Sequence, residues 1–258
     1  MNTTTRKGYA RAADIPADIL LSLSRGEIAS ATLSESLAID QRLLVQTVFP
    51  ELTQAQRDDF EHLCELGILK RMMGVGAWLW QTGGQEAWDR CRTHGSDTVR
   101  GWACFMAGAQ PGLNQADRLA KLQPLADDMH FGVREWAWMA ARPHLVADLD
   151  AAIVLLTDWT GFPSERLRRF ACEALRPRGV WCAHIGVLKQ EPWRMLPILS
   201  ALNRDPSLYV QDSVANWLND AAKDQPDWVK ALCGQWQEQA ALEPSTQRIC
   251  KRALRSLA

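Results

Sequence analysis

Apolar residues recur along most of this chain at the three- and four-residue spacing that is typical of amphipathic helices. No stretch alternates apolar and polar residues for long enough to predict a β-strand. Short polar turns separate the helical stretches, for example at residues 127–132, 160–165 and 203–207. The pattern therefore predicts an all-α protein.

The helical pattern is irregular in the N-terminal third and regular after it. We expect one domain over 1–258, in which polar residues 1–12 are disordered, residues 13–95 form N-terminal helices and residues 96–258 form regular helix pairs. The N-terminal helices are predicted at about 14–26, 32–49, 54–66, 68–80 and 85–93. The first helices of the pairs are predicted at about 116–126, 149–159, 192–202 and 226–240, and the second helices at about 97–109, 131–142, 165–176, 207–222 and 245–257.

A short sequence motif that recurs every 34 residues identifies these pairs as repeats. The letters VRGWA at 99–103 return as VREWA at 133–137 and as LRRFA at 167–171, and looser copies begin at Val210 and Thr246. Units of this length cannot bury their apolar faces alone, so they stack on their neighbours. Polar turns followed by an alanine-rich Val-Arg helix are typical of HEAT-like repeats. We therefore expect a HEAT-like helical repeat solenoid, an α–α superhelix that brings the same position of every copy to one wall.

One step between the copies is longer than the others. The successive steps are 34, 34, 43 and 36 residues, and the extra residues lie at about 177–192. Irregular connections in a regular scaffold often carry function, so this insertion is a candidate for the functional part of the surface.

Composition argues against a disulfide-rich, a secreted or a membrane-spanning protein. The chain has a net charge of −1, 12 Trp but only 2 Tyr, and 7 Cys without a CxxC pair, so we expect free, buried thiols in a reducing cytosol. The first 13 residues lack the apolar core of a signal peptide, and no apolar run approaches the ~20 residues of a membrane span, which predicts a cytoplasmic protein. Residues 163–258 carry 10 acidic and 14 basic side chains, so the near-neutral total conceals a basic region that a polyanion could use.

Guanidinium groups, aromatic rings and carboxylates recur side by side in the second helices. Arg binds phosphate, Trp stacks on a base or sugar, and a carboxylate among them indicates that a positive charge is met there. N-alkylated purines carry such a charge, and cleavage of their glycosidic bond develops a further positive charge on the sugar that a carboxylate stabilises. The candidates are Arg134, Glu135, Trp136, Trp138, Arg168, Arg169, Glu173, Arg176, Arg178, Trp181, Tyr209, Asp212, Asn216, Asn219, Asp220 and Lys223.

Structural roles compete with these functional ones. Trp136 occupies the same repeat position as Trp102, which favours a core role, whereas Trp138 lies further round the helix and is expected to be exposed. Glu173 and Arg176 stand three residues apart and could simply pair with each other. The five His show no metal-ligand spacing, and we predict no metal and no cofactor.

The stretch 130–257 resembles the AlkC-type DNA alkylation repair glycosylases, relatives of the AlkD type within the HEAT-like repeat superfamily. The matching text is FGVREWAW at 131–138, SERLRRFACEALRPR at 164–178 and, most specifically, DPSLYVQDSVANWLND at 205–220, followed by KD at 223–224 and PD at 226–227. The beginning is similar too, at IPAD (15–18) and GEI (26–28). The chain departs from the family pattern at Gln211, where an Arg is usual. Because the sequence ends at Ala258, directly after the last repeat, we also expect no immunoglobulin-like C-terminal domain of the kind that some members use to clasp DNA.

The resemblance implies hydrolytic removal of positively charged bases from duplex DNA on a concave DNA-binding face, without a cofactor. The bases are chiefly 3-methyladenine and, in the AlkC type, also 3-methylcytosine. By motif position the resemblance implies that the catalytic residues are Glu135, Glu173 and Asp220. Trp181 is expected to contact the lesion, with Trp138 as a second candidate. The residues expected to bind DNA are Arg134, Arg168, Arg169, Arg176, Arg178, Tyr209, Asn216 and Lys223.

Two other interpretations stay open at this point. The chain could be a non-catalytic HEAT-repeat scaffold that binds DNA or protein, in which case the three acids should be scattered or paired off. It could also be a glycosylase for bulky or crosslinked adducts, which an open cleft would admit. A monomer that acts on alkylated double-stranded DNA, away from any membrane, is the expectation that we carry forward.

Overall fold

The computed structural model describes residues 6–239 and 243–257. Within these two ranges every regular element is a helix and no strand is present, which confirms the prediction of an all-α chain. The chain divides into two compact units, and α8 (Phe131–Ala147) contributes its residues up to Ala140 to unit one and those from Ala141 to unit two. Unit one comprises residues up to 113 and 128–140, and unit two comprises 114–127 and 141 onward.

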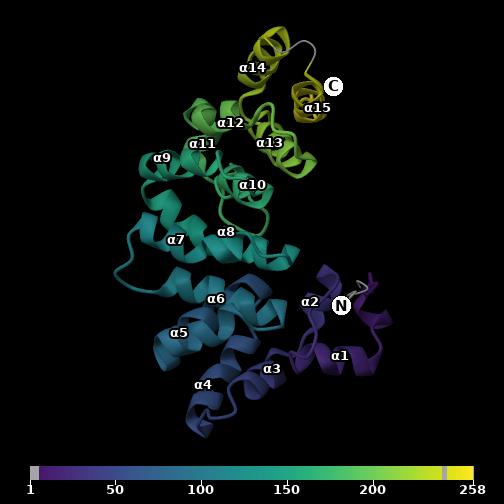
Figure 1. Ribbon diagram of the computed structural model, residues 1–258, viewed down its shortest axis with the longest axis vertical. Helices are drawn as coiled ribbons and strands as arrows, with labels where there is room; N and C mark the ends of the chain where they lie inside the picture. The colour runs from purple at the N-terminus through teal and green to yellow at the C-terminus, as the bar shows by residue number, and fades with distance from the viewer. Residues whose placement is uncertain (1–5, 240–242, 258) are drawn as a thin grey trace. The chain divides into compact units, whose positions relative to one another are not determined.

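Unit one is organised around two long helices that pack along each other, α5 and α6. Gly76 permits this close approach, because a Cβ atom at this position would lie only 2.4 Å from the Cβ of Phe105. Gly84 adopts a left-handed φ of 51° and kinks α5 at the Gly-Gly break that the sequence predicts. The helices of unit one are η1 (Ala12–Asp14), α1 (Ala17–Ser24), α2 (Leu33–Ala38), α3 (Gln41–Val48), α4 (Gln54–Cys64), α5 (Ile68–Arg92), α6 (Asp97–Ala109) and the first part of α8 (Figure 1).

The N-terminal segment is held against α2 by one buried carboxylate. Glu35, whose side chain is fully buried, pairs with Arg6 at 2.5 Å and accepts hydrogen bonds from the amides of Tyr9 (3.0 Å) and Ala31 (2.7 Å). The predicted disorder is therefore wrong for residues 6–11, because a polar segment can be ordered by polar partners that lie distant in the sequence. Residues 1–5 lie outside the described residues.

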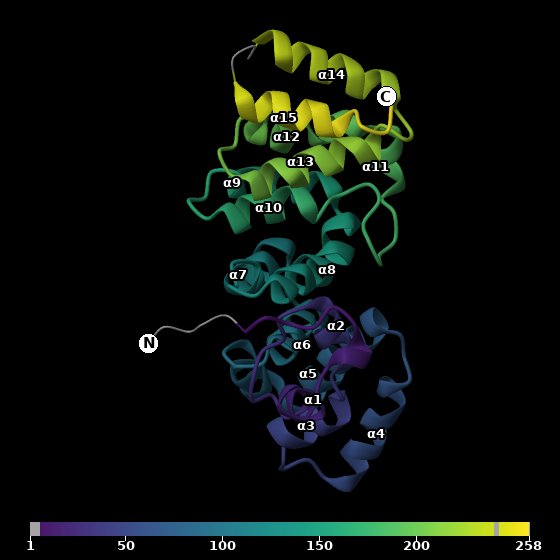
Figure 2. The ribbon, with the colours of Figure 1, turned by 90° about the vertical axis from the view of Figure 1, so that its right-hand side faces the viewer.

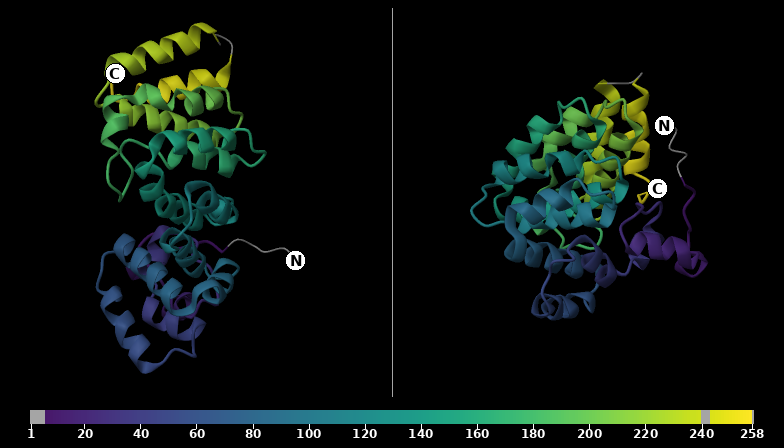
Figure 3. Two further views of the ribbon diagram at one scale, coloured as in Figure 1. Left: turned by 90° about the vertical axis from the view of Figure 1, so that its left-hand side faces the viewer. Right: turned by 60° about the horizontal axis from the view of Figure 1, so that its bottom comes forward.

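Unit two stacks its helices in successive layers. The second helices α10, α13 and α15 lie side by side in that order, and Figures 2 and 3 show these layers from opposite sides. Trp217 of α13 is completely buried and donates Nε1 to the carbonyl of Leu175, at 3.0 Å. The helices are α7 (Gln115–Ala126), the last part of α8, α9 (Leu149–Trp159), α10 (Glu165–Glu173), α11 (Gly186–Gln190), η2 (Pro192–Met195), α12 (Leu196–Leu202), α13 (Leu208–Ala221), α14 (Pro226–Gln239) and α15 (Pro244–Ala253).

The arginine of the repeated motif joins each second helix to the preceding turn through hydrogen bonds. Arg100, Arg134 and Arg168 each donate to the carbonyls six and five residues upstream, at 2.7–3.0 Å. Arg100 also pairs with Asp128, and Arg168 with Asp205, through two hydrogen bonds each. These turn carboxylates in turn accept the amide two residues downstream. The recurrence of this arginine is thus explained by its hydrogen bonds to the preceding turn.

Most predicted helix positions agree with the structure, and the exceptions have local causes. Residues 32–49 form two helices instead of one, because the side chain of Asp40 caps the first amides of α3 and breaks the run. α8 continues through Pro143 to Ala147, whereas α10 ends at Glu173, three residues early. All seven cysteines are free, and only Cys182 is partly exposed, as the composition indicates. No helix among the described residues is long and apolar enough to cross a bilayer.

Candidate active site

The structure brings two of the three predicted acids together in unit two. Glu173 is the last residue of α10, and Asp220 lies near the end of the neighbouring helix α13. Their side chains meet at Arg176, which donates Nη1 to Glu173 Oε1 (2.9 Å) and both Nη2 and Nε to Asp220 Oδ2 (2.7 and 3.0 Å). Both acids are buried, with 4% and 5% of their surface exposed.

Three further predicted residues surround this trio. Arg169 lies 3.6 Å from Glu173 Oε2, and its guanidinium stacks 4.5 Å above the ring of Tyr209. Lys223 is half-exposed, and its Nζ lies 3.4 Å from Asp220 Oδ1. The two carboxylates therefore sit among three cations.

The two oxygens of each acid differ in their remaining capacity to accept hydrogen bonds. Both oxygens of Glu173 are engaged, because Oε2 also accepts the hydroxyl of Ser213 at 2.6 Å. Asp220 gives Oδ2 to Arg176, whereas Oδ1 has a long contact to Lys223. Asp220 Oδ1 is consequently the carboxylate oxygen with the most capacity left for a further donor.

Opposing effects set the ionisation of this cluster. Burial by itself would raise the pKa of Glu173, but the charges of Arg169 and Arg176 and the hydrogen bond from Ser213 more than offset it, so that the pKa is lowered. For Arg176, burial lowers the pKa, and the two acids raise it by more. Glu173 is therefore an anion at neutral pH in spite of its burial.

A loop that follows α10 carries the predicted aromatic contact. Residues 174–185 project beyond the helix ends, as Figures 2 and 3 show. Trp181 in this loop has a left-handed φ of 63° and is 47% exposed. A bulky side chain in that conformation costs about 1–3 kcal/mol, and such strain persists only where the surroundings impose it. Arg178, from the same loop, is held by two-pronged contacts to Asp224 at 2.9–3.2 Å.

The seam between α13 and α15 contains cations that sequence reasoning missed. Arg248 and Arg252 share a single carboxylate oxygen of Asp212, at 2.7 and 3.0 Å. Arg255 donates to Asn216 Oδ1 at 2.9 Å, which explains a polar residue in the interior of α13. The signal was the placement of three arginines four and three residues apart in the last predicted helix.

The remaining predicted residues have partners in their own unit. In unit one, Trp138 is only 2% exposed and donates Nε1 to Glu135 Oε2 at 2.7 Å, so its expected exposure is wrong and it offers almost no surface to a lesion. The indole packs into the core because α8 is buried on that side too. Trp136, at 4% exposure, is a core residue as its repeat position predicts. Gln211 donates to the carbonyl of Asp205 at 2.8 Å and so keeps one of the turn contacts that an arginine makes in the other repeats.

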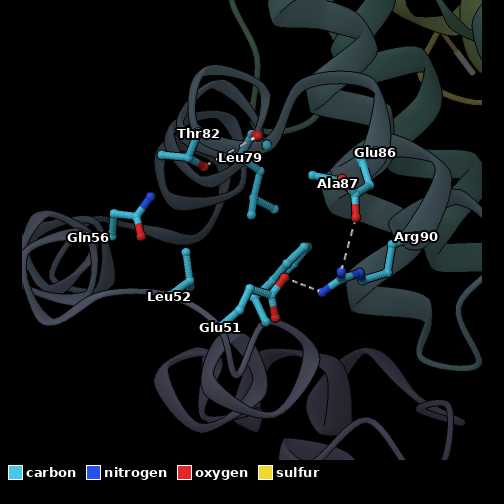
Figure 4. A pocket seen from close by; sticks show the side chains of 10 residues that line it. Glu51, Leu52, Gln56, Leu79, Thr82, Glu86, Ala87 and Arg90 are labelled. Carbon is cyan, nitrogen blue, oxygen red and sulfur yellow. Dashed lines mark hydrogen bonds and ion pairs between the residues drawn. The ribbon is translucent and has the colours of Figure 1, made fainter.

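The pocket in Figure 4 is a hollow of unit one with a volume of about 320 Å³. Its cation, Arg90, contacts Glu51 at 2.6 Å and Glu86 at 3.8 Å, so its charge is met within the chain. None of the predicted site residues lines it. Across residues 6–239 and 243–257, no group of three or more His, Cys, Asp or Glu side chains is arranged to hold a metal ion.

Helix pairs fastened by repeated Arg–turn contacts define the chain as a helical repeat protein. Its structure is similar to that of the alkylpurine DNA glycosylase AlkC of Pseudomonas fluorescens bound to DNA containing an abasic site analogue, with a TM-score of 0.68 and 23% identity. That match covers 97% of this chain and 65% of AlkC. AlkD2 of Streptococcus mutans matches with a TM-score of 0.53 and 20% identity, over 83% of this chain and 96% of AlkD2.

A curated protein also matches part of the chain in sequence. The uncharacterized protein YhaZ of Bacillus subtilis (strain 168) is 42% identical over 118 residues, which are 46% of this chain and 32% of YhaZ. No established protein-family profile matches the chain. The chain thus has the HEAT-like repeat fold of the AlkC and AlkD type, as the sequence resemblance predicts.

Proposed function

We propose that this chain is a DNA glycosylase that hydrolyses the N-glycosidic bond of positively charged N-alkylated bases in duplex DNA. 3-Methyladenine is the expected substrate, and 3-methylcytosine is a further candidate. The observation that supports this function best is the cluster at the end of α10, where Arg176 joins Glu173 and Asp220 beside the exposed Trp181 loop. The fold shared with AlkC and AlkD2 points the same way.

The cluster can supply what departure of a cationic base requires. The bond breaks as positive charge develops on the sugar, and a fixed anion nearby lowers the energy of that state. Glu173 supplies a permanent negative charge, because its lowered pKa keeps it ionised. Asp220 Oδ1 has the capacity to orient the attacking water and to accept its proton. The departing base needs no proton, since departure neutralises it.

We propose that the DNA phosphates are bound by the arginines and lysines whose charge is least compensated by carboxylates of the chain. Arg168 and Arg178 each face a carboxylate through paired hydrogen bonds, whereas Arg248 and Arg252 divide one acid and Arg255 meets neutral oxygens. Phosphate contacts release counterions, so each one steepens the salt dependence of binding. In this proposal the α13–α15 seam joins Arg169 and Lys223 in holding the strand.

Base release from defined duplexes tests the activity. The duplexes carry 3-methyladenine, 3-methylcytosine or 7-methylguanine, and the released bases are identified and quantified. We expect Asp220→Asn and Glu173→Gln each to reduce release by more than about 100-fold, with Asp220→Asn more severe, while DNA binding persists. The matched control is Asp227→Asn, which removes a carboxylate that is 98% exposed on α14, and its release should equal that of the unaltered chain. Undiminished release by both acid variants would refute the assignment of these acids.

Binding to undamaged duplex tests the backbone assignment separately. Replacing Arg248, Arg252 and Arg255 together with Gln should lower the slope of log affinity against log salt by about 2–3. Lys230→Gln on the adjacent α14 is the control and should leave the slope as it is. An unchanged slope in the triple variant would place the DNA elsewhere.

A second candidate function is a DNA-binding repeat protein without catalysis. One observation favours it, namely that both acids of the cluster are ion-paired and nearly buried. The release assay separates the two functions: binding without release of any of the three bases supports the non-catalytic candidate.

A further inference from the structure

The loop 174–185 is wrapped around one buried guanidinium, that of Arg142 near the end of α8. Arg142 is 3% exposed and donates to three backbone carbonyls, those of Ala174 (2.9 Å), Arg176 (2.7 Å) and Ala183 (3.0 Å). Among the described residues it makes no ion pair with a carboxylate. Its charge is met instead by carbonyl dipoles at the end of α10, where a cation is favourable. Arg142 thus ties the beginning of the loop to its end.

The backbone of the loop is fitted to this guanidinium. A Cβ atom on Gly179 would lie 2.3 Å from Cys182 Sγ and 3.3 Å from Arg142 Cζ, so only glycine fits there without displacement. A hydrogen bond from the amide of Ile185 to the carbonyl of Pro177, at 3.0 Å, closes the loop. The backbone between Pro177 and Ile185 is therefore restricted to few conformations.

Two residues of the proposed site depend on this arrangement. Trp181 lies between the loop residues that Arg142 holds, and its left-handed backbone needs an external constraint. Arg176 gives its carbonyl to Arg142 and its guanidinium to the two acids. A shift of this backbone would therefore move both the indole and the bridge between the carboxylates.

We propose that Arg142 is a positioning residue of the proposed glycosylase, one that fixes the loop 174–185 so that Trp181 and Arg176 are held in their site geometry before DNA binds. The inference rests on the proposed function for its effect on base release, but not for its effect on the loop. Arg142 makes no hydrogen bond or ion pair with Glu173 or Asp220, so we assign its role to the backbone contacts of the loop.

Hydrogen exchange on the free protein and single-turnover release of 3-methyladenine together test the inference. In Arg142→Met, exchange of amides within 174–185 should accelerate by about tenfold or more, because local opening becomes easier. Release should fall by about 100-fold, the scale expected for a misplacement of roughly 1 Å, while DNA affinity changes far less. Arg142→Lys keeps the charge with fewer aligned donors and should give intermediate values. Adding Arg142→Met to Trp181→Ala should cost less than the product of the two single losses, since part of the effect of Arg142 is exerted through Trp181.

Glycine variants protect the test against misfolding of the Arg142 variants. Gly179→Ala disturbs the loop from its other side and should reproduce the faster exchange and slower release. Gly186→Ala, just after the loop, meets no atom within 4 Å and should behave like the unaltered chain. Unchanged loop exchange in both Arg142→Met and Gly179→Ala overturns the inference, as do losses that multiply in the double variant. If the unaltered chain releases no base, the proposed function fails, and the exchange measurements still decide whether Arg142 positions the loop.

Discussion

Arg142 and Arg176 stand 34 residues apart, at the same position of successive repeats, but they bind different partners. Arg142 donates to three backbone carbonyls of the following helix end, whereas Arg176 donates to two carboxylates. Asn219 occupies this position in the next repeat and behaves like Arg142, because it donates to the carbonyl of Ala253 at 2.9 Å. In these two repeats the side chain at this position therefore caps the next helix end.

The acids account for the difference. One repeat earlier, the residues corresponding to Glu173 and Asp220 are Met139 and Pro177, neither of which offers a carboxylate. The acid pair thus occurs at one particular junction between two neighbouring repeats, and the insertion at about 177–192 lies between the two acids in the sequence. Arg176 departs from the capping role of Arg142 and Asn219, and it does so where the repeat length also changes. This departure distinguishes a residue with a candidate chemical role from residues that stabilise the fold.

The largest expected effect comes from removing the bridge. Arg176→Met leaves two nearly buried carboxylates without their main partner, and we expect the free energy of unfolding to fall by about 3–5 kcal/mol. Urea denaturation followed by circular dichroism measures this loss.

A triple variant sharpens the result. Glu173→Gln and Asp220→Asn combined with Arg176→Met remove the whole charge cluster, and most of the lost stability should return, because neutral groups no longer demand a cation. If the triple variant is as unstable as Arg176→Met alone, the loss reflects packing of the arginine and the comparison with Arg142 loses its electrostatic basis.

A smaller effect is expected where the position keeps its capping role. Asn219→Leu removes the donor to the carbonyl of Ala253 and should cost about 1–3 kcal/mol, the range for leaving a buried acceptor unsatisfied. The same denaturation experiment measures it. Gly234→Ala, in the interior of α14 where an added methyl meets nothing within 4 Å, serves as a reference and should raise the free energy of unfolding by about 0.5–1 kcal/mol. A loss as large as that of Arg176→Met would contradict the distinction between capping and charge bridging.

Periodicity predicted the architecture because each helix buries one face, and burial of one face requires apolar residues at three- and four-residue spacing. The helix pairs, the turns and the core position of Trp136 follow from it. The predicted exposure of Trp138 failed for the same reason in reverse, since a helix inside a stacked array buries more than one face. The break at Asp40 was missed because a single cap can divide an otherwise continuous apolar pattern.

The site was less accessible to sequence reasoning. The residue pattern placed Glu173 and Asp220 among many candidates, and only a family resemblance marked them as catalytic, because no spacing rule links residues 47 apart that meet at one guanidinium. Arg142 was not named at all, because its partners are carbonyls of a loop without any periodic pattern. Contacts of this kind depend on the path of the backbone, which local sequence does not specify.

The smallest expected effect concerns the pH dependence of stability, and it isolates the charge of Glu173. Its pKa is lowered in the folded chain, so its stabilising contribution is complete above the unfolded value near 4.5 and is lost as the pH falls below it. Glu173→Gln should therefore flatten the acid limb of the stability profile below about pH 4.5. Glu35 of unit one, whose pKa is lowered to about 2 chiefly by its hydrogen bond with Arg6, provides an independent reference. In an Arg176→Met background, Glu35→Gln should keep its full effect on the acid limb, whereas Glu173→Gln should lose part of its own, because Arg169 remains but Arg176, the other cation that lowers the pKa of Glu173, is gone. Equal persistence of both effects would show that Arg176 does not control the ionisation of Glu173, and the contrast between the two arginines would then rest on geometry alone.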